Sequence, residues 1–497
     1  LLVTSRNHFT LPGLVARNLD ELPHEDACEL LLKIEPRIGD AADRIARLCD
    51  RLPIALRLAA GALAERPDLT PDSYLHQLVD EKKRLGLIEG TLKLSVQLLS
   101  EELQGLWCRL VVFPDSFDAD AAAAVWGLEP ALVLDSLGML VRSSLVDGKD
   151  GRYRLHDLIR LFADSHLDDA GRNESRVRHA EYYLQVLSTA DNLYLKDRES
   201  VLAGLRLFDS EWTNIQAGHR WASSYAGSER RANEIARDFA DSGVYILSFR
   251  QNPRERIDWL QAGLNSCRGL EDRRGEGKAL GNMGLAYAAL GEPRRAIELY
   301  EQALVIDREI DDRRGEGIDL GNMGLAYAAL GEFKHAIELY EQRLAIARDI
   351  GDRRGEGNAL GSMGIVYRNL GEFKHAIELY EQWLAIARDI GDRRGEGKAL
   401  CNMGNAYADL GEPRRAIELY EQQLAIARDI GDRLGEASTS WNLGLALESQ
   451  DELAHAAEQM QPWVEYLKEI GHPNTEAHEA RVQQIRDRLA ANEFPPD

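Results

Sequence analysis

Apolar side chains recur at every third or fourth position through the second half of the chain, for example at Leu280, Met283, Tyr287, Ile297, Tyr300 and Leu304. This spacing gathers them on one face of an α-helix. Gly291 stands between the two apolar stretches, where one helix must end and the chain must turn. The sequence therefore predicts two consecutive antiparallel helices, each with one apolar face.

The same pair of helices recurs with a period of 40 residues, since the tetrapeptide GNMG begins at Gly281 and again at Gly321. Its variants begin at Gly361, Cys401 and Trp441. A turn glycine follows at the same spacing, at Gly291, Gly331, Gly371 and Gly411. A constant period near 40 residues is typical of a stacked array of helix pairs, in which neighbouring units share one continuous core.

Short signals predict where the helices of each unit begin, end and meet. Pro293 and Pro413 suit the first turn of the second helix, where a missing N–H costs nothing, and Phe333 and Phe373 hold the same place in two other units. The second helices are expected to end at Gly351-Asp352 and Gly391-Asp392. One glycine position never changes and predicts a close approach of two helices, at Gly284, Gly324, Gly364, Gly404 and Gly444.

The frame of each unit resembles the signature of the tetratricopeptide repeat family, at Leu280, Met283, Gly284, Tyr287, Ala296, Tyr300 and Ala303. Arg308 stands where the family's usual unit of about 34 residues ends near a proline. The array is therefore similar to the long-repeat subclass of kinesin light chains and of spindle adaptors that bind peptides. We assign 236–450 to the repeats, starting with a degenerate unit near 240–270, then 451–490 to polar capping helices and 491–497 to a tail.

In arrays of this family the first helix of each unit lines the concave side, which implies a groove for a protein or an extended peptide. One set of candidate contacts is a ladder of amides with one hydroxyl, at Asn282, Asn322, Ser362, Asn402 and Asn442. A second set is mainly apolar, at Leu285, Leu325, Ile365 and Asn405. The Arg-rich turns are expected to be solvated edges, at Arg273-Arg274, Arg313-Arg314, Arg353-Arg354 and Arg393-Arg394.

The ladder has two interpretations. An amide both donates and accepts hydrogen bonds, so it can pair with the backbone of an extended peptide whatever the peptide's sequence. Alternatively, each Asn bonds a neighbouring backbone group or a helix end. In either case the groove is expected to be apolar in its early units and polar from about Asn358 onward.

The front third of the chain shows a different organisation. Apolar residues recur every three to four positions from 19 to 32, from 41 to 64 and in shorter stretches further on, which predicts helices. Ser144-Leu145-Val146 and Arg152-Tyr153-Arg154-Leu155 predict the strands of a β-hairpin, with its turn at 147–151. Helices that end in a hairpin are typical of a winged-helix domain. The whole chain is therefore expected to be mainly α.

Three short motifs, in this order, resemble the rear half of an NB-ARC domain, the nucleotide switch of STAND signalling ATPases: Leu2-Val3-Thr4-Ser5-Arg6, Leu52-Pro53-Ile54-Ala55-Leu56 and Leu155-His156-Asp157. They are most similar to bacterial regulators of the antibiotic-regulatory type. Arg51 and Leu155 replace the family's usual glycine and methionine. The resemblance assigns 1–88 to the end of the nucleotide-binding region, 89–167 to a winged-helix domain and 168–235 to a helical connector.

This resemblance implies that Arg6 faces the terminal phosphate, Pro53 the adenine, and His156 the phosphates of ADP in the resting state. A guanidinium offers forked donors to phosphate, an imidazole can donate one hydrogen bond, and a proline ring suits a flat base. Alternatively, Arg6 is a solvated loop residue, Pro53 only begins a helix, and His156 only caps the helix that follows it.

The groups that would hold Mg²⁺ and a triphosphate are missing, because the sequence contains no G-x-x-x-x-G-K-[ST] loop and no apolar strand ending in paired acids before the first motif. No other catalytic motif is present either. We therefore expect no enzyme activity from the chain as numbered. Leu1 stands in the middle of an expected core strand, which suggests a missing upstream portion, and ADP or ATP is expected to bind only with that portion.

Composition narrows the remaining classes of function. The net charge is −23, with 60 Lys and Arg against 83 Asp and Glu, and the predicted hairpin turn is acidic at Asp147 and Asp150. Both facts argue against a nucleic-acid surface. The five cysteines lack disulfide or metal spacing, which indicates a reducing, cytoplasmic location. No stretch reads as a membrane span or a signal peptide.

Two functions fit these observations. The first is the sensory and regulatory part of a STAND-type nucleotide switch, whose repeats bind a partner and which could oligomerise on activation. The alternative is an adaptor or scaffold that works without nucleotide, and ADP binding would separate the two. In the connector, Trp212 and Ile215 fit a packed helix face better than a ligand site.

Overall fold

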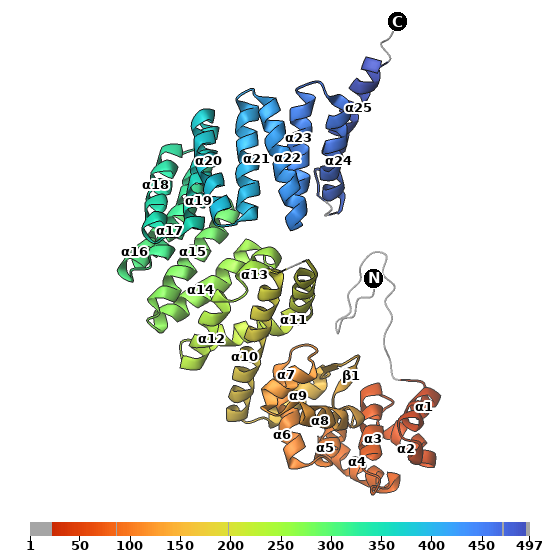
Figure 1. The fold of residues 1–497 in the computed structure, drawn as a ribbon. Helices are drawn as coiled ribbons and strands as arrows, with labels where there is room; N and C mark the ends of the chain where they lie inside the picture. The colour runs from red at the N-terminus through yellow and green to blue at the C-terminus, as the bar shows by residue number, and fades with distance from the viewer. Residues whose placement is uncertain (1–21, 86, 197, 470–471, 494–497) are drawn as a thin grey trace. The chain divides into compact units, whose positions relative to one another are not determined.

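The computed structural model describes residues 22–85, 87–196, 198–469 and 472–493 (Figure 1). The first motif, with Arg6, lies outside the described residues. The chain divides into two compact units between Ile246 and Leu247. Apart from one two-stranded hairpin, the regular structure of the described residues is helical, as expected. Every helix in the described part of the chain is too short or too polar to cross a bilayer.

The first unit opens with helices around a small apolar core. Their bounds are α1 (His24–Ile34), η1 (Pro36–Ala41), α2 (Ala42–Leu48), α3 (Pro53–Glu65), α4 (Pro71–Leu85) and α5 (Leu87–Gln97). Pro53 is the first residue of α3, where its fixed φ suits the helix and its missing N–H leaves no bond unmade. Leu31 of α1 and Leu56 of α3 are fully buried in the core that these helices share.

A second group of short elements follows: α6 (Glu101–Arg109), η2 (Leu110–Val112), α7 (Ala119–Trp126), α8 (Pro130–Arg142), β1 (Asp147–Lys149), β2 (Arg152–Arg154) and α9 (Asp157–His166). The predicted hairpin is present, but its first strand begins at Asp147, so the predicted position of that strand was wrong. Asp150 and Gly151 have φ angles of 51° and 76°, and this pair closes the turn in two residues. Residues predicted as turn are therefore strand, and Lys149 pairs with Arg152.

Three helices connect this group to the second unit: α10 (Asp169–Tyr194), α11 (Arg198–Tyr225) and α12 (Arg230–Asp241). Ile215 is fully buried and Trp212 is half-buried, as expected for a packed face of α11. Buried polar groups join α11 to the hairpin, because Arg152 of β2 forms an ion pair with Glu211. The carbonyl of Ser116 accepts hydrogen bonds from Arg152 at 2.8 Å and from Asn214 at 2.9 Å.

After α13 (Val244–Arg250), the second unit is a stack of helix pairs (Figure 1). The bounds are α14 (Pro253–Gly269), α15 (Arg273–Ala289), α16 (Pro293–Glu309), α17 (Arg313–Ala329), α18 (Phe333–Asp349), α19 (Arg353–Asn369), α20 (Phe373–Asp389), α21 (Arg393–Asp409), α22 (Pro413–Ile430), α23 (Arg433–Glu448), α24 (Leu453–Glu469) and α25 (Thr475–Glu493). The pair α13 and α14 occupies the place of the expected degenerate unit. Two expected boundaries fall inside helices, the one after residue 88 in α5 and the one after residue 235 in α12.

The turns and helix starts of the repeats follow the local signals in the sequence. The turn glycines take positive φ angles of 77°, 77°, 80° and 84°, at Gly291, Gly331, Gly371 and Gly411. Pro293, Phe333, Phe373 and Pro413 each begin a second helix, as predicted. An aspartate caps each first helix through the amide three residues on, as Asp352 does for Gly355 at 2.9 Å.

The unchanging glycine of the frame permits close contact between the two helices of a unit. A Cβ atom at Gly324 would lie 2.6 Å from the ring of Tyr340, and one at Gly364 would lie 2.4 Å from the ring of Tyr380. In the last unit the same contact is made by Gly444 and Met460, at 2.4 Å. The predicted reason for these glycines is therefore confirmed.

The expectation that the Arg-rich turns are solvated edges was wrong for the first arginine of each pair, whereas the second arginine is exposed, as at Arg274 and Arg354. The first arginine of each pair binds a buried glutamate three residues on, as Arg353 binds Glu356, which is 6% exposed. A second arginine from the preceding helix binds the same carboxylate, as Arg348 does at 2.8 Å. Glutamates held in this way by two arginines are Glu276, Glu316, Glu356 and Glu396. Each of these turns thus contains an ionic link between consecutive helices, in which the carboxylate is buried and the arginines are about half exposed.

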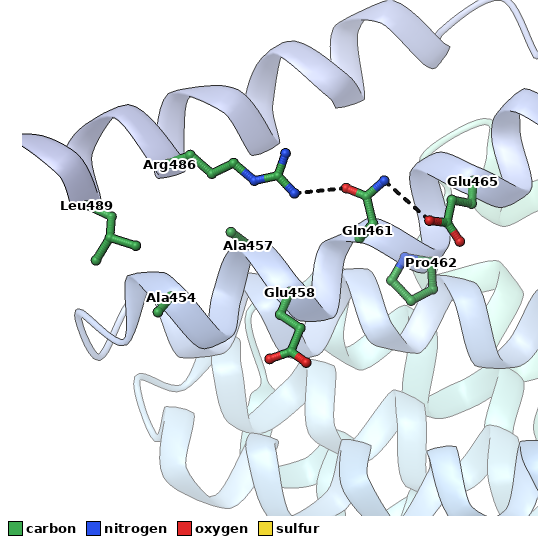
Figure 2. Close-up of a pocket in the computed structure, with 8 residues that line it drawn as sticks. All are labelled: Ala454, Ala457, Glu458, Gln461, Pro462, Glu465, Arg486 and Leu489. Atoms are coloured by element: carbon green, nitrogen blue, oxygen red, sulfur yellow. Dashed lines mark hydrogen bonds between the residues drawn. The ribbon is translucent and has the colours of Figure 1, made fainter.

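The last two helices, α24 and α25, leave a hollow of about 500 Å³ between them (Figure 2). Ala454, Ala457 and Leu489 line its apolar part. Gln461 accepts a hydrogen bond from Arg486 at 3.2 Å and donates one to Glu465 at 3.4 Å. This polar surface is what the sequence predicts for the capping end of a stack.

Candidate functional site on the inner face of the repeats

The first helices of successive repeats, α15, α17, α19, α21 and α23, contact one another directly and form what we call the inner face. Large apolar side chains stand exposed on it. Leu285 is 46% exposed, Leu325 is 55% exposed and Ile365 is 42% exposed. Because an exposed apolar side chain costs free energy in water, a row of them on one face indicates a contact surface.

A pocket of about 290 Å³ lies between the first two full repeats. It brings together three residues that the sequence singled out, Leu285 of α15 and Asn322 and Leu325 of α17. Tyr300 and the turn residues Gly291 and Pro293 complete its wall. The pocket is thus mainly apolar, with one amide beside it.

The ladder of amides is divided between two roles. Asn405 accepts hydrogen bonds from Tyr420 at 2.7 Å and from Asn442 at 3.2 Å, so Asn442 ties two repeats together. Ser362 lies beside the hydroxyl of Tyr340. The described residues provide no hydrogen-bond partner for the remaining side chains of the ladder, Asn282, Asn322 and Asn402. Within the described part of the ladder, these three amides are the ones free to bind a partner.

The inner face becomes polar in its third and fourth repeats, as the sequence suggested. Arg368 of α19 donates to Asp409 of α21 at 2.6 Å across the repeat boundary. The sequence marks the position of Asp409 as variable along the groove, but it did not single out Arg368. The sequence could have shown this pair, because opposite charges replace the alanines that stand at the equivalent positions of the first full repeat, Ala288 and Ala289.

Two buried carboxyl groups interact between α16 and α17, at Asp307 and Asp319, and each residue is 6% exposed. Burial and the neighbouring acids raise the pKa of Asp319 to about 8 and that of Asp307 to about 6. At neutral pH the pair therefore keeps about one proton. Sequence reasoning missed this pair. It could have been noticed because two acids replace the alanines that occupy the equivalent positions one repeat later, Ala347 and Ala359.

The candidate nucleotide contacts lie on separate helices of the first unit. Pro53 is exposed at the start of α3. His156 is exposed at the start of α9, where its Nδ1 accepts a hydrogen bond from the amide of Leu158 at 3.3 Å. The structure therefore shows the capping role of His156, and a nucleotide role stays a prediction.

Comparisons with known proteins identify the repeats and the class of relative. The tetratricopeptide repeat family matches residues 275–349, 318–389 and 395–461. The regulatory protein AfsR of Streptomyces griseus is 32% identical over 288 residues, which are 52% of this chain and 28% of that protein. AfsR of Streptomyces coelicolor is 36% identical over 178 residues, 33% of this chain and 18% of that protein. The chain thus spans less than a third of the length of these relatives.

The fold of the chain is similar to that of a solved structure. The signal transduction ATPase with numerous domains (STAND) from Pyrococcus horikoshii, which has a tetratricopeptide repeat sensor, aligns with a TM-score of 0.50 at 18% identity. The alignment covers 97% of this chain and 71% of that chain. The second half of the chain is therefore an array of tetratricopeptide repeats, in a protein that resembles STAND proteins in fold and AfsR-type regulators in sequence.

Proposed function

We propose that this chain is the sensing part of a STAND-type regulator and that its inner face binds an extended segment of a partner protein. The observation that carries the proposal is the pocket that joins two exposed leucines, Leu285 and Leu325, to the amide of Asn322, which has no hydrogen-bond partner in the described part of the chain. An extended segment presents side chains at alternate positions and a backbone between them. The leucines would bind an apolar side chain, and the amide would bind the backbone beside it.

The test uses peptides as probes of the inner face. Peptides of about 12 residues are selected from a random library on the whole chain, because about four repeats span such a length in extended form. Their affinities are then measured for the parent chain and for Leu325→Asp. We expect the substitution to weaken binding about tenfold or more, because it places a charge in an apolar pocket.

Val305→Asp is the matched control. Val305 of α16 is 55% exposed, the same fraction as Leu325, but it belongs to a second helix and not to the pocket. It should leave peptide affinity unchanged. If both substitutions weaken the peptides equally, or neither does, the inner-face proposal is wrong.

We also propose that the front of the chain contributes to a nucleotide switch, with Pro53 and His156 as contacts of ADP. The chain as numbered should not hydrolyse ATP, because it has no phosphate loop. The structural role of His156 as a helix cap favours the alternative, an adaptor without nucleotide. Calorimetric titration with ADP of a longer version that includes a phosphate loop separates them, since the switch requires binding that His156→Ala weakens and His166→Ala does not. Absence of ADP binding by a version that carries a phosphate loop would favour the adaptor.

A further inference from the structure

The first unit contains a pocket between η2, α10 and α11, and neither Pro53 nor His156 lines it. Its volume is about 300 Å³. Its apolar wall comes from Val111 and Val112, and its polar wall from Arg176 and Arg220. Small-molecule sites in proteins begin at about this size.

The two arginines give the pocket an unbalanced positive charge. Arg172 and Arg178, which flank Arg176 on α10, form ion pairs with Asp164 and Glu174. Arg176 itself is half-buried and has no acidic partner among the described residues, and the same holds for the exposed Arg220. No residue that lines the pocket is acidic. Two guanidinium groups on one pocket wall, without a carboxylate beside them, offer forked donors to an anion.

Aromatic rings form another wall of this pocket. Trp221 and Tyr225 lie one helical turn apart on α11, with ring centroids 6.0 Å apart and an angle of 27° between the rings. Trp221 is 9% exposed, and its indole N–H has no hydrogen-bond partner among the described residues. A buried indole donor normally has a partner, so this one is unsatisfied in the structure.

We propose that this pocket binds a small aromatic or heteroaromatic anion. Its ring would lie against Trp221 and the valines of η2, where apolar area is available. Its carboxylate or phosphate would lie between Arg176 and Arg220, whose guanidinium groups suit either anion. The pocket would thus be a ligand site in the connector, separate from the inner face of the repeats.

The experiment uses three probes with the whole chain: indole-3-acetate, 1-naphthyl phosphate and the neutral indole-3-acetamide. Binding is measured by saturation-transfer NMR, because a ligand of this size is expected to bind with a Kd of about 1 mM. We expect at least one anion to bind, and the neutral amide to bind about tenfold more weakly or worse. The stronger of the two anions identifies the preferred charged group.

The substitutions Arg176→Gln and Arg220→Gln together should weaken the bound anion about tenfold or more. Arg206→Gln is the matched control. Arg206 lies on α11 like Arg220 and is also exposed, but it does not line the pocket. Circular dichroism establishes that each variant is folded, and Arg220→Gln alone serves if the double variant is not. The proposal fails if neither anion binds at about 10 mM, if the amide binds equally well, or if Arg206→Gln has the same effect.

Discussion

A single ring illustrates how individual side chains hold the repeats together. Tyr340 is 1% exposed and contacts Gly324 of the helix before it. Tyr340→Ala should lower the free energy of unfolding by about 3 to 5 kcal/mol, because it leaves a cavity that the helices cannot close. Urea unfolding of the parent and the variant measures the difference. Tyr340→Phe is the control, with an expected loss of about 1 kcal/mol or less, because it keeps the ring and removes only the hydroxyl. A loss below about 1 kcal/mol for the alanine variant would contradict this packing.

The buried carboxyl pair should make stability depend on pH. Burial raises the pKa of Asp319 to about 8 in the folded chain, from an ordinary value of 3.8. Between these two values the unfolded chain releases a proton that the folded chain keeps, so stability falls as pH rises. Replacing Asp307 and Asp319 together by Ala should remove this slope. At pH 8 it should stabilise the chain by at least about 1 kcal/mol.

Unfolding midpoints at several pH values between about 5 and 8.5 test this prediction. Asp312 and Glu316 also face the pair, and Arg274 opposes them, so these groups are left unchanged. Asp349→Ala is the control, because Asp349 lies in the same repeat and its side chain is 70% exposed. Equal pH profiles for the parent and the double variant would show that the pair does not hold a proton.

The link between consecutive helices is an ionic contact that repeats along the array. Burial opposes ionisation of Glu356, but Arg348 and Arg353 hold the pKa of this carboxyl below its ordinary value. The contact therefore stabilises the fold above that ordinary value, and the stabilisation is lost as pH falls. Glu356→Gln should cost about 1 to 3 kcal/mol at neutral pH.

The last copy of this link provides the comparison. Glu436 is bound by Arg428, its side chain is 33% exposed, and Arg433 binds Glu469 instead. Glu436→Gln should therefore cost less than about 1 kcal/mol. Guanidinium unfolding of both variants at about pH 7 and about pH 4 measures the difference. A larger loss for Glu436→Gln than for Glu356→Gln would overturn the assignment.

Two turns carry a non-glycine residue where later copies have glycine, at Glu271 and Asp311, and the second of them should be improvable. Asp311 adopts a φ angle of 56°, whereas glycine occupies the same place at Gly351, Gly391 and Gly431 with φ angles of 69°, 67° and 69°. A side chain in this conformation costs about 1 kcal/mol. Asp311→Gly should therefore raise stability by about 0.5 kcal/mol or more in thermal unfolding, and Gly351→Asp should lower it by a similar amount. A lower stability for Asp311→Gly would show that the aspartate makes a compensating contact.

Substitutions in the array should be able to change binding without changing stability. The packed interfaces between neighbouring repeats stabilise the array, whereas the inner face stays accessible to a partner. Asn322 and Asn402 have no hydrogen-bond partner among the described residues. Replacing both by Ala should weaken selected peptides about tenfold and leave the melting temperature nearly unchanged. Asn442→Ala should lower the melting temperature and leave peptide affinity nearly unchanged, because Asn442 donates a hydrogen bond to Asn405 of the neighbouring repeat. Equal peptide capture by the double variant would exclude the proposed clamp.

Signals that act within a few residues can be read directly from the amino-acid sequence. The period of 40 residues, the helix pairs, the turn glycines and the prolines that begin helices are all set by local backbone preferences. The contact between Gly324 and Tyr340 is also predictable, since both residues recur in register along the array. The leucines and the amide of the first pocket can likewise be placed on one face by counting along the helix.

Contacts between residues far apart in the sequence cannot be read in this way. The first strand of the hairpin is shifted from its predicted place because Asp150 and Gly151 form a tighter turn than a count of turn residues suggests, whereas the second strand lies where it was predicted. The arginines of the turns looked solvated because their glutamate partners become buried only when the helices stack. Arg152 binds Glu211, and Trp221 lies beside η2. Neither contact follows from a repeating pattern in the sequence. Helices and turns are set by neighbouring residues, so the sequence pattern reveals them. Ion pairs and pocket walls depend instead on which surfaces meet after folding, so only the tertiary structure reveals them.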